Sequence, residues 1–107
     1  MSSRPKKKKP PANPAQDVTQ AMQAAMHAHR NGNLKEAVKQ YRRVVAADPA
    51  APQPQYNLGL ALKGLGKLEG AEKAFSAAIR LSPGYARAYA ALANLLDQRG
   101  KSAKALT

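Results

Sequence analysis

The chain has 107 residues, carries 18 Lys and Arg against 6 Asp and Glu, and contains no cysteine. This length has room for one domain, and the lack of cysteine excludes a disulfide framework and a thiolate-bound metal. The formal net charge of +12 favours anionic partners without specifying one. No apolar run resembles a secretory signal or approaches the roughly twenty residues of a membrane span, so we expect a cytoplasmic protein with no membrane contact.

Residues 1–16 form a segment of their own, which is rich in proline and basic at Arg4 and Lys6–Lys9. Because such a segment buries too little apolar surface to offset the entropy of ordering it, a disordered tail is predicted. The lysine run is either a solubilising arm, which we favour, or a contact for nuclear import or nucleic acid. No aromatic residue lies among these lysines to stack on bases, so nucleic acid is the weaker hypothesis.

From Asp17 onward, hydrophobic residues recur at helical spacing and turn residues separate the segments. Asp17 is predicted to cap the first helix, and Gly32 is predicted to end it in the left-handed conformation. Pro49 and Pro83 are predicted to stop the second and fourth helices. The pattern predicts five helices and the start of a sixth, over the approximate ranges 17–31, 34–46, 52–66, 68–81, 85–100 and from 102 onward.

The chain matches itself when it is shifted so that Gly32 falls on Gly66 and Gly66 on Gly100. The other residues in register are Ala37, Ala71 and Ala105; Ala25, Gly59 and Ala93; Tyr41 and Phe75; and Pro49 and Pro83. A period equal to the separation of Gly32 from Gly66, with small residues and prolines in fixed places, is typical of a helical repeat. The small residues are predicted to let helix backbones approach closely, and Tyr41 and Phe75 to fill the space between hairpins.

On these residues the chain resembles the tetratricopeptide repeat (TPR) family, whose repeat places Leu-Gly, Ala, an aromatic residue and Pro at fixed positions. The middle repeat carries Leu58, Gly59, Ala71, Phe75 and Pro83 in those places. The resemblance implies an all-α fold, a right-handed superhelical stack of helical hairpins over residues 17–107. We divide it into about two and a half repeats, at 18–51, 52–85 and 86–107.

In this family the first helix of each repeat lines a concave groove that binds a peptide or protein segment. The resemblance therefore implies a ligand-facing surface made of Met22, Met26, Tyr56, Asn57, Leu60, Lys63, Arg87 and Asn94. Some members grip peptide carboxylates with a clamp of Lys, Asn, Asn, Lys and Arg. The matching residues in this chain are Met22, Met26, Asn57, Arg87 and Ala91. A surface that is apolar at one end and basic at the other suits an acidic peptide with a hydrophobic anchor.

The sequence shows no arrangement for catalysis or for binding a cofactor or metal. His27 and His29 are two positions apart, so they lie on different sides of a helix and cannot chelate one metal from it. Residues 64–67 contain two glycines and a lysine, but no strand precedes them, so they are not a phosphate loop. We therefore predict that the chain is not an enzyme.

The leading interpretation is a non-catalytic interaction module or scaffold. One alternative is the N-terminal part of a longer enzyme of glycosyltransferase, sulfotransferase or methyltransferase type, and a weaker one is a nucleic-acid-associated protein. A repeat stack also needs a terminal helix with a polar outer face, and here the sixth helix is cut off after about one turn. We therefore expect Tyr89, Leu92, Leu96 and the second-helix surface around Phe75 and Ile79 to be only partly covered, which indicates self-association through this end or a truncated chain.

Overall fold

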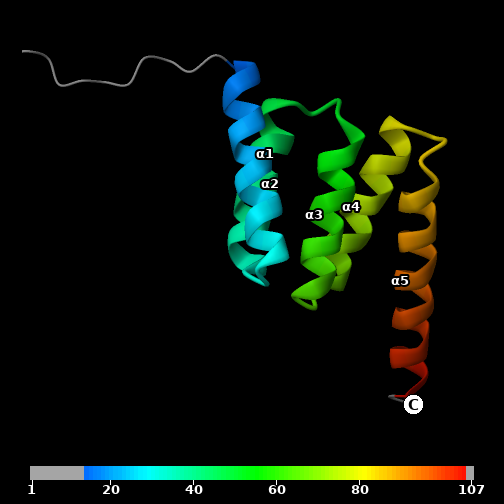
Figure 1. The fold of residues 1–107 in the computed structure, drawn as a ribbon. Coiled ribbons are helices and arrows are strands. Elements are labelled where there is room, and N and C mark those ends of the chain that lie inside the picture. The colour runs from blue at the N-terminus through cyan, green and yellow to red at the C-terminus, as the bar shows by residue number, and fades with distance from the viewer. Residues whose placement is uncertain (1–13, 106–107) are drawn as a thin grey trace, which may run out of the picture.

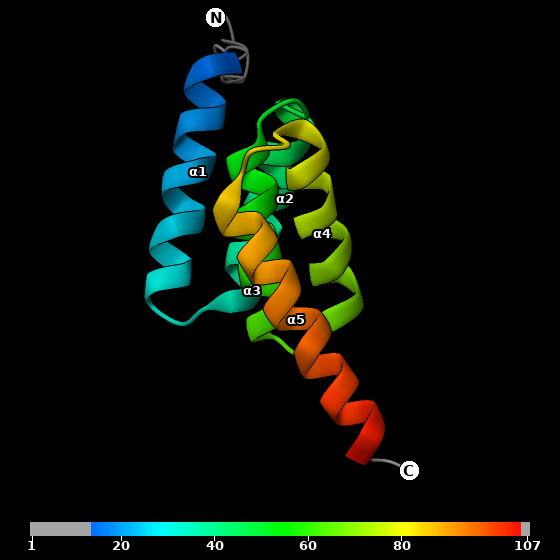
Figure 2. The ribbon, with the colours of Figure 1, turned by 90° about the vertical axis from the view of Figure 1, so that its right-hand side faces the viewer.

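The computed structural model describes residues 14–105, and within this range it is built of helices without a strand. The helices are α1 (Pro14–Arg30), α2 (Leu34–Ala47), α3 (Pro52–Gly64), α4 (Leu68–Leu81) and α5 (Ala86–Ala105). They form antiparallel hairpins in two layers, with α1, α3 and α5 in one layer and α2 and α4 in the other (Figures 1 and 2). The predicted all-α stack of hairpins is confirmed.

The turns inside the first two hairpins have the same structure and lie one repeat apart. Gly32 and Gly66 both have φ of 79°, the left-handed conformation that glycine adopts without steric cost. After each glycine the next amide donates back to a carbonyl near the end of the preceding helix, from Asn33 to Ala28 and from Lys67 to Leu62, both at 2.9 Å. This pattern closes a helix by satisfying its last carbonyls, so the predicted role of both glycines is confirmed.

The core lies where small residues bring the two layers together. Ala25, Ala37 and Ala71 are fully buried, and so is Phe75. Helices α3 and α4 approach closely at Gly59, because a Cβ atom there would lie only 2.5 Å from Cε1 of Phe75. The prediction that small residues permit close packing is confirmed. Phe75 fills the space against α3 inside its own hairpin, and because it is fully buried the expected partial exposure around it is wrong.

The first helix begins earlier than the sequence pattern predicts. Helix α1 starts at Pro14, so residues 14–16 are helical and not part of a disordered tail. Proline is favoured in the first turn because its fixed φ suits a helix and its missing N–H would be unpaired there anyway. Asp17 consequently lies inside the first turn rather than capping it. The remainder of the expected tail, including Lys6–Lys9, lies outside the described residues.

The predicted break at Gly100 and the predicted sixth helix are wrong. Helix α5 continues through Gly100, which does not have positive φ, and ends at Ala105. In the earlier hairpins the leucine that follows shortly after the turn glycine anchors the second helix. Leu34 contacts α3 at Gly64, and Leu68 packs on the core. The equivalent residue is Ser102, so no apolar anchor draws the chain back and the helix continues.

Candidate peptide-binding groove

The eight residues predicted to face a ligand all lie on α1, α3 and α5, which form one layer of the stack (Figure 2). Met26, Arg87 and Asn94 are exposed, and the other five, Met22, Tyr56, Asn57, Leu60 and Lys63, are half-buried. Their distribution over the three helices therefore agrees with the expectation. Whether they bind a ligand stays a prediction.

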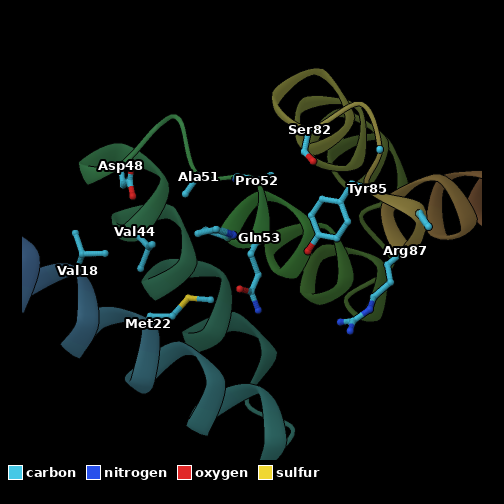
Figure 3. Close-up of a pocket in the computed structure, with 13 residues that line it drawn as sticks. Val18, Met22, Val44, Asp48, Ala51, Pro52, Gln53, Ser82, Tyr85 and Arg87 are labelled. Carbon is cyan, nitrogen blue, oxygen red and sulfur yellow. The ribbon is translucent and has the colours of Figure 1, made fainter.

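A cavity of about 890 Å³ lies between the amino-terminal ends of these helices and the carboxyl-terminal end of α2. Its walls are Val18 and Met22 of α1, Val44 and Asp48 at the end of α2, residues 51–54 at the start of α3, and Ser82 and residues 84–87 before and within the first turn of α5. The side chains of Met22, Gln53 and Arg87 extend into this common space from three different helices (Figure 3). Both hairpins and helix α5 are therefore needed to build it.

Only two of the eight predicted residues, Met22 and Arg87, line this cavity. The sequence pattern did not predict the lining residues that lie outside the first-helix positions, above all Val44, Asp48 and Tyr85. Tyr85 follows the Ser82–Gly84 turn, and its amide donates to the Ser82 carbonyl at 3.0 Å. This hydrogen bond fixes its position immediately before the first residue of α5. An aromatic residue directly after a Pro-Gly turn is the one sequence signal that could have indicated it.

Aromatic rings pack against one another beside the cavity. The ring of Tyr56 lies 5.3 Å from that of Tyr85 and 6.0 Å from that of Phe75, both tilted, at distances typical of stabilising aromatic pairs. Burial raises the pKa of Tyr85, the neighbouring Tyr56 raises it further, and the positive charge of Arg87 partly opposes both effects. Tyr85 is therefore a neutral phenol at physiological pH, and it offers a polar hydroxyl next to a cation.

The charged residues of the cavity lie on opposite walls. Arg87 extends from the first turn of α5 and Asp48 lies just past the end of α2 (Figure 3). Between them the lining is mostly apolar, through Val18, Met22 and Val44. This arrangement can hold an extended segment that places an acidic group at Arg87 and an apolar side chain against α1 and α2.

The two histidines stabilise local structure. The Nδ1 atom of His29 is hydrogen-bonded to the Tyr41 hydroxyl at 3.0 Å, and the Asn31 amide donates to Nε2 of His27 at 3.1 Å. The described residues contain no group of three His, Cys, Asp or Glu side chains placed to hold a metal ion. Within the same part of the chain, no helix is both long enough and apolar enough to cross a membrane.

Stacked helical hairpins of one fixed period, with a groove lined by the first helix of each, define a helical-repeat protein. Family models match the chain over its repeats, as "TPR repeat" at residues 29–66 and as "Tetratricopeptide repeat" at residues 52–85 and 74–107. The chain belongs to the tetratricopeptide repeat family.

Known proteins similar to this chain carry the same repeat. It is 35% identical over 89 residues to the TPR repeat-containing thioredoxin TTL4 of Arabidopsis thaliana, a match that covers 83% of this chain but only 13% of that protein. The second TPR of Spaghetti (RPAP3) bound to the HSP90 peptide SRMEEVD is 28% identical, with a TM-score of 0.76 and 80% of each chain covered. The second TPR domain of human RPAP3 in complex with the HSP70 peptide SGPTIEEVD is 27% identical, with a TM-score of 0.78 over 87% of this chain and 78% of that one.

Proposed function

We propose that this chain is a non-catalytic module that binds a peptide or protein segment in the groove formed by α1, α3 and α5. The observation that carries the proposal is the cavity of about 890 Å³, into which Met22, Gln53 and Arg87 extend from the three helices. Two similar TPR domains of known structure are bound to peptides, which supports the same use of the surface here. A cytoplasmic location remains part of this proposal.

The chemistry of the groove favours an acidic peptide with an apolar anchor. Arg87 supplies a cation at one wall, and Lys63 supplies a second one on α3, while Met22 and Val44 offer apolar surface. Of the five positions that form a carboxylate clamp in some family members, only Asn57 and Arg87 are suited to gripping a carboxylate. We therefore infer that carboxylate binding depends on fewer contacts than in a full clamp, and that burial of the anchor supplies more of the affinity.

Titration by fluorescence anisotropy tests this proposal. The labelled probe is SRMEEVD, compared with a peptide whose two glutamates and aspartate are replaced by their amides and with one whose methionine is replaced by serine. We expect both replacements to weaken binding. Arg87→Glu should weaken binding of the acidic peptide by about tenfold or more, since it reverses a charge at the site. Arg80→Glu, an equal change of charge at an exposed residue of α4 outside the cavity, is the matched control.

Equal weakening by Arg87→Glu and Arg80→Glu would show that only net charge matters and would contradict a groove site. Tyr56→Ala is the second variant, because it removes the ring that supports Tyr85. Full binding by both Arg87→Glu and Tyr56→Ala would move the site elsewhere on the molecule. Circular dichroism of each variant separates lost binding from lost folding.

The alternative that this chain is a segment of a longer enzyme is supported by one observation, that it spans only 13% of the thioredoxin relative. In that case the groove would bind a substrate or partner for a catalytic domain elsewhere in the protein. The weaker alternative, a nucleic-acid contact, depends on Lys6–Lys9, which the structure does not describe. A second copy of the chain, suggested as a partner through the C-terminal end, would use a surface outside the groove.

A further inference from the structure

Asp48 gives one wall of the groove cavity a negative charge that no described residue neutralises. It is the one acidic residue among those that line the cavity, and its side chain is exposed. Its carboxylate takes part in no hydrogen bond or ion pair within the described part of the chain. A carboxylate that faces a cavity without a cationic partner is available to bind a cation that a ligand brings.

The end of helix α2 adds to this negative charge. A helix carries a partial negative charge at its carboxyl-terminal end, where its last carbonyls lack partners in the helix, and a basic residue in the last turn can offset it. The last turn of α2 contains no basic residue, and Asp48 caps the helix directly after it. The carboxylate and the helix end therefore act in the same direction, because both favour a nearby cation.

The second hairpin shows that the repeat does not require this arrangement. The register equivalents of Ala46 and Asp48 are Arg80 and Ser82, so α4 has a basic residue in its last turn and a neutral cap. The backbone ends both helices in the same way, since the amide of each cap residue donates to the carbonyl four positions earlier at 2.9 Å. The turn therefore does not need the Asp48 carboxylate.

The opposite wall of the cavity is positive. Arg87 extends into the cavity from the first turn of α5 (Figure 3), and the amino-terminal end of a helix carries a partial positive charge of its own. Val18, Met22 and Val44 supply apolar surface between the two walls. A bound segment therefore meets a negative end, an apolar middle and a positive end in that order.

We propose that Asp48 is a specificity-determining residue of the groove, which binds a cationic side chain of the ligand while Arg87 binds an acidic one. The ligand is then a segment with an apolar side chain between a basic and an acidic residue, rather than a wholly acidic segment. This proposal rests on the function proposed for the groove and adds the requirement for a cation. Overall charge has the opposite effect, because a protein of net charge +12 repels a cation on its ligand.

A double-mutant cycle between protein and peptide tests the contact by the same anisotropy titration. The probe SRMEEVD, whose arginine precedes its methionine, is compared with a peptide in which that arginine is replaced by glutamine. With the wild-type protein we expect the replacement to weaken binding by about two- to fivefold, the strength of a partly exposed ion pair. With Asp48→Asn the replacement should have no effect or should strengthen binding, because only repulsion by the net charge remains.

Glu69→Gln is the matched control, since it removes the same charge from an exposed residue of α4 outside the cavity. It should distinguish the two peptides as the wild type does. Asp48→Ser is the second variant, because serine occupies the equivalent position at the end of α4 and is therefore compatible with the turn. It should behave as Asp48→Asn does, and circular dichroism checks that each variant is folded.

The possible failures of this proposal and of the groove function can be told apart. If the wild type binds the replaced peptide as tightly as SRMEEVD or more tightly, no residue of the groove binds the cation and the proposal is wrong. Equal weakening in the wild type and in both Asp48 variants would assign the cation to another residue, and loss of the difference in Glu69→Gln would reduce the effect to net charge. Each of these results leaves peptide binding itself intact, whereas no binding of SRMEEVD at all would refute the groove function and this proposal with it.

Discussion

Replacing Gly59 by alanine tests the close contact between α3 and α4, on which the core of the second hairpin depends. The added Cβ would lie 2.5 Å from Cε1, 2.6 Å from Cδ1 and 3.0 Å from Cζ of Phe75. These distances are far below van der Waals contact. The Phe75 ring is fully buried and packs against Tyr56, so it cannot move away without disturbing a second aromatic residue.

Two opposing effects set the size of the change. Alanine in a helix interior is favoured over glycine by about 0.5–1 kcal/mol, while overpacking a well-packed core costs about 1–3 kcal/mol. Because three ring atoms are involved and the ring has no free space, we expect the cost to lie near its upper end. The net expectation is a loss of about 2–2.5 kcal/mol in the free energy of unfolding, or a melting temperature lower by about 8–20 °C, at about 4–8 °C per kcal/mol.

Gly100→Ala is the matched control, since Gly100 is also in a helix but a Cβ there would meet no atom within 4 Å. The same substitution should therefore stabilise α5 by about 0.5–1 kcal/mol. Urea unfolding followed by circular dichroism measures both variants. In the double variant that carries both Gly59→Ala and Phe75→Leu, the smaller side chain relieves the clash. Its loss of stability should therefore be smaller than the sum of the losses of the two single variants, which a double-mutant cycle measures as a positive coupling. If Gly59→Ala were as stable as Gly100→Ala, the close contact would not exist.

Three further predictions use the same unfolding assay. Gly66→Ala should cost about 1–2 kcal/mol because φ is 79° there, and an unchanged stability would contradict the left-handed turn. Ala71→Leu, at a fully buried residue, should cost about 1–3 kcal/mol by overpacking, and a neutral result would mean that the hairpin register is wrong. Burial raises the pKa of Tyr41, an effect that Arg30 partly opposes. The folded state therefore holds this proton more tightly than the unfolded state, whose pKa is near 10. Its stabilising effect is complete below about pH 10 and is lost as the pH rises through the folded value. Tyr41→Phe should flatten this alkaline loss of stability, and an unchanged pH profile would contradict the assignment to Tyr41.

The repeat and its core could be predicted from the sequence because each rests on local chemistry that recurs from one hairpin to the next. Gly32 and Gly66 specify the same left-handed turn, and Ala37 and Ala71 specify the same close approach. The break expected at Gly100 failed because a matching glycine is not sufficient. The turn also needs an apolar residue two positions later, and Ser102 does not supply one.

The candidate site could be predicted only in part. Helical periodicity places residues such as Met22, Asn57 and Arg87 on one layer, because that depends on the register within each helix. It does not predict which residues from different hairpins share one cavity, because that depends on the rotation between successive hairpins. Val44 and Asp48 enter the cavity through that rotation, and no pattern within their own helix indicates it.

Helix α5 shows how a first helix of this repeat contacts the stack and lines the groove with different sides. Successive residues of a helix are rotated by about 100°, so α5 presents three usable sides. Ala88 and Leu95 are buried against the rest of the stack, Arg87 and Asn94 are on the groove side, and Tyr89 lies on a third, exposed side. In α3 all three sides are in use, because α4 covers the side that corresponds to the exposed side of α5. A first helix of this repeat is therefore fully covered only when a second helix packs on it, as α2 does on α1 and α4 does on α3.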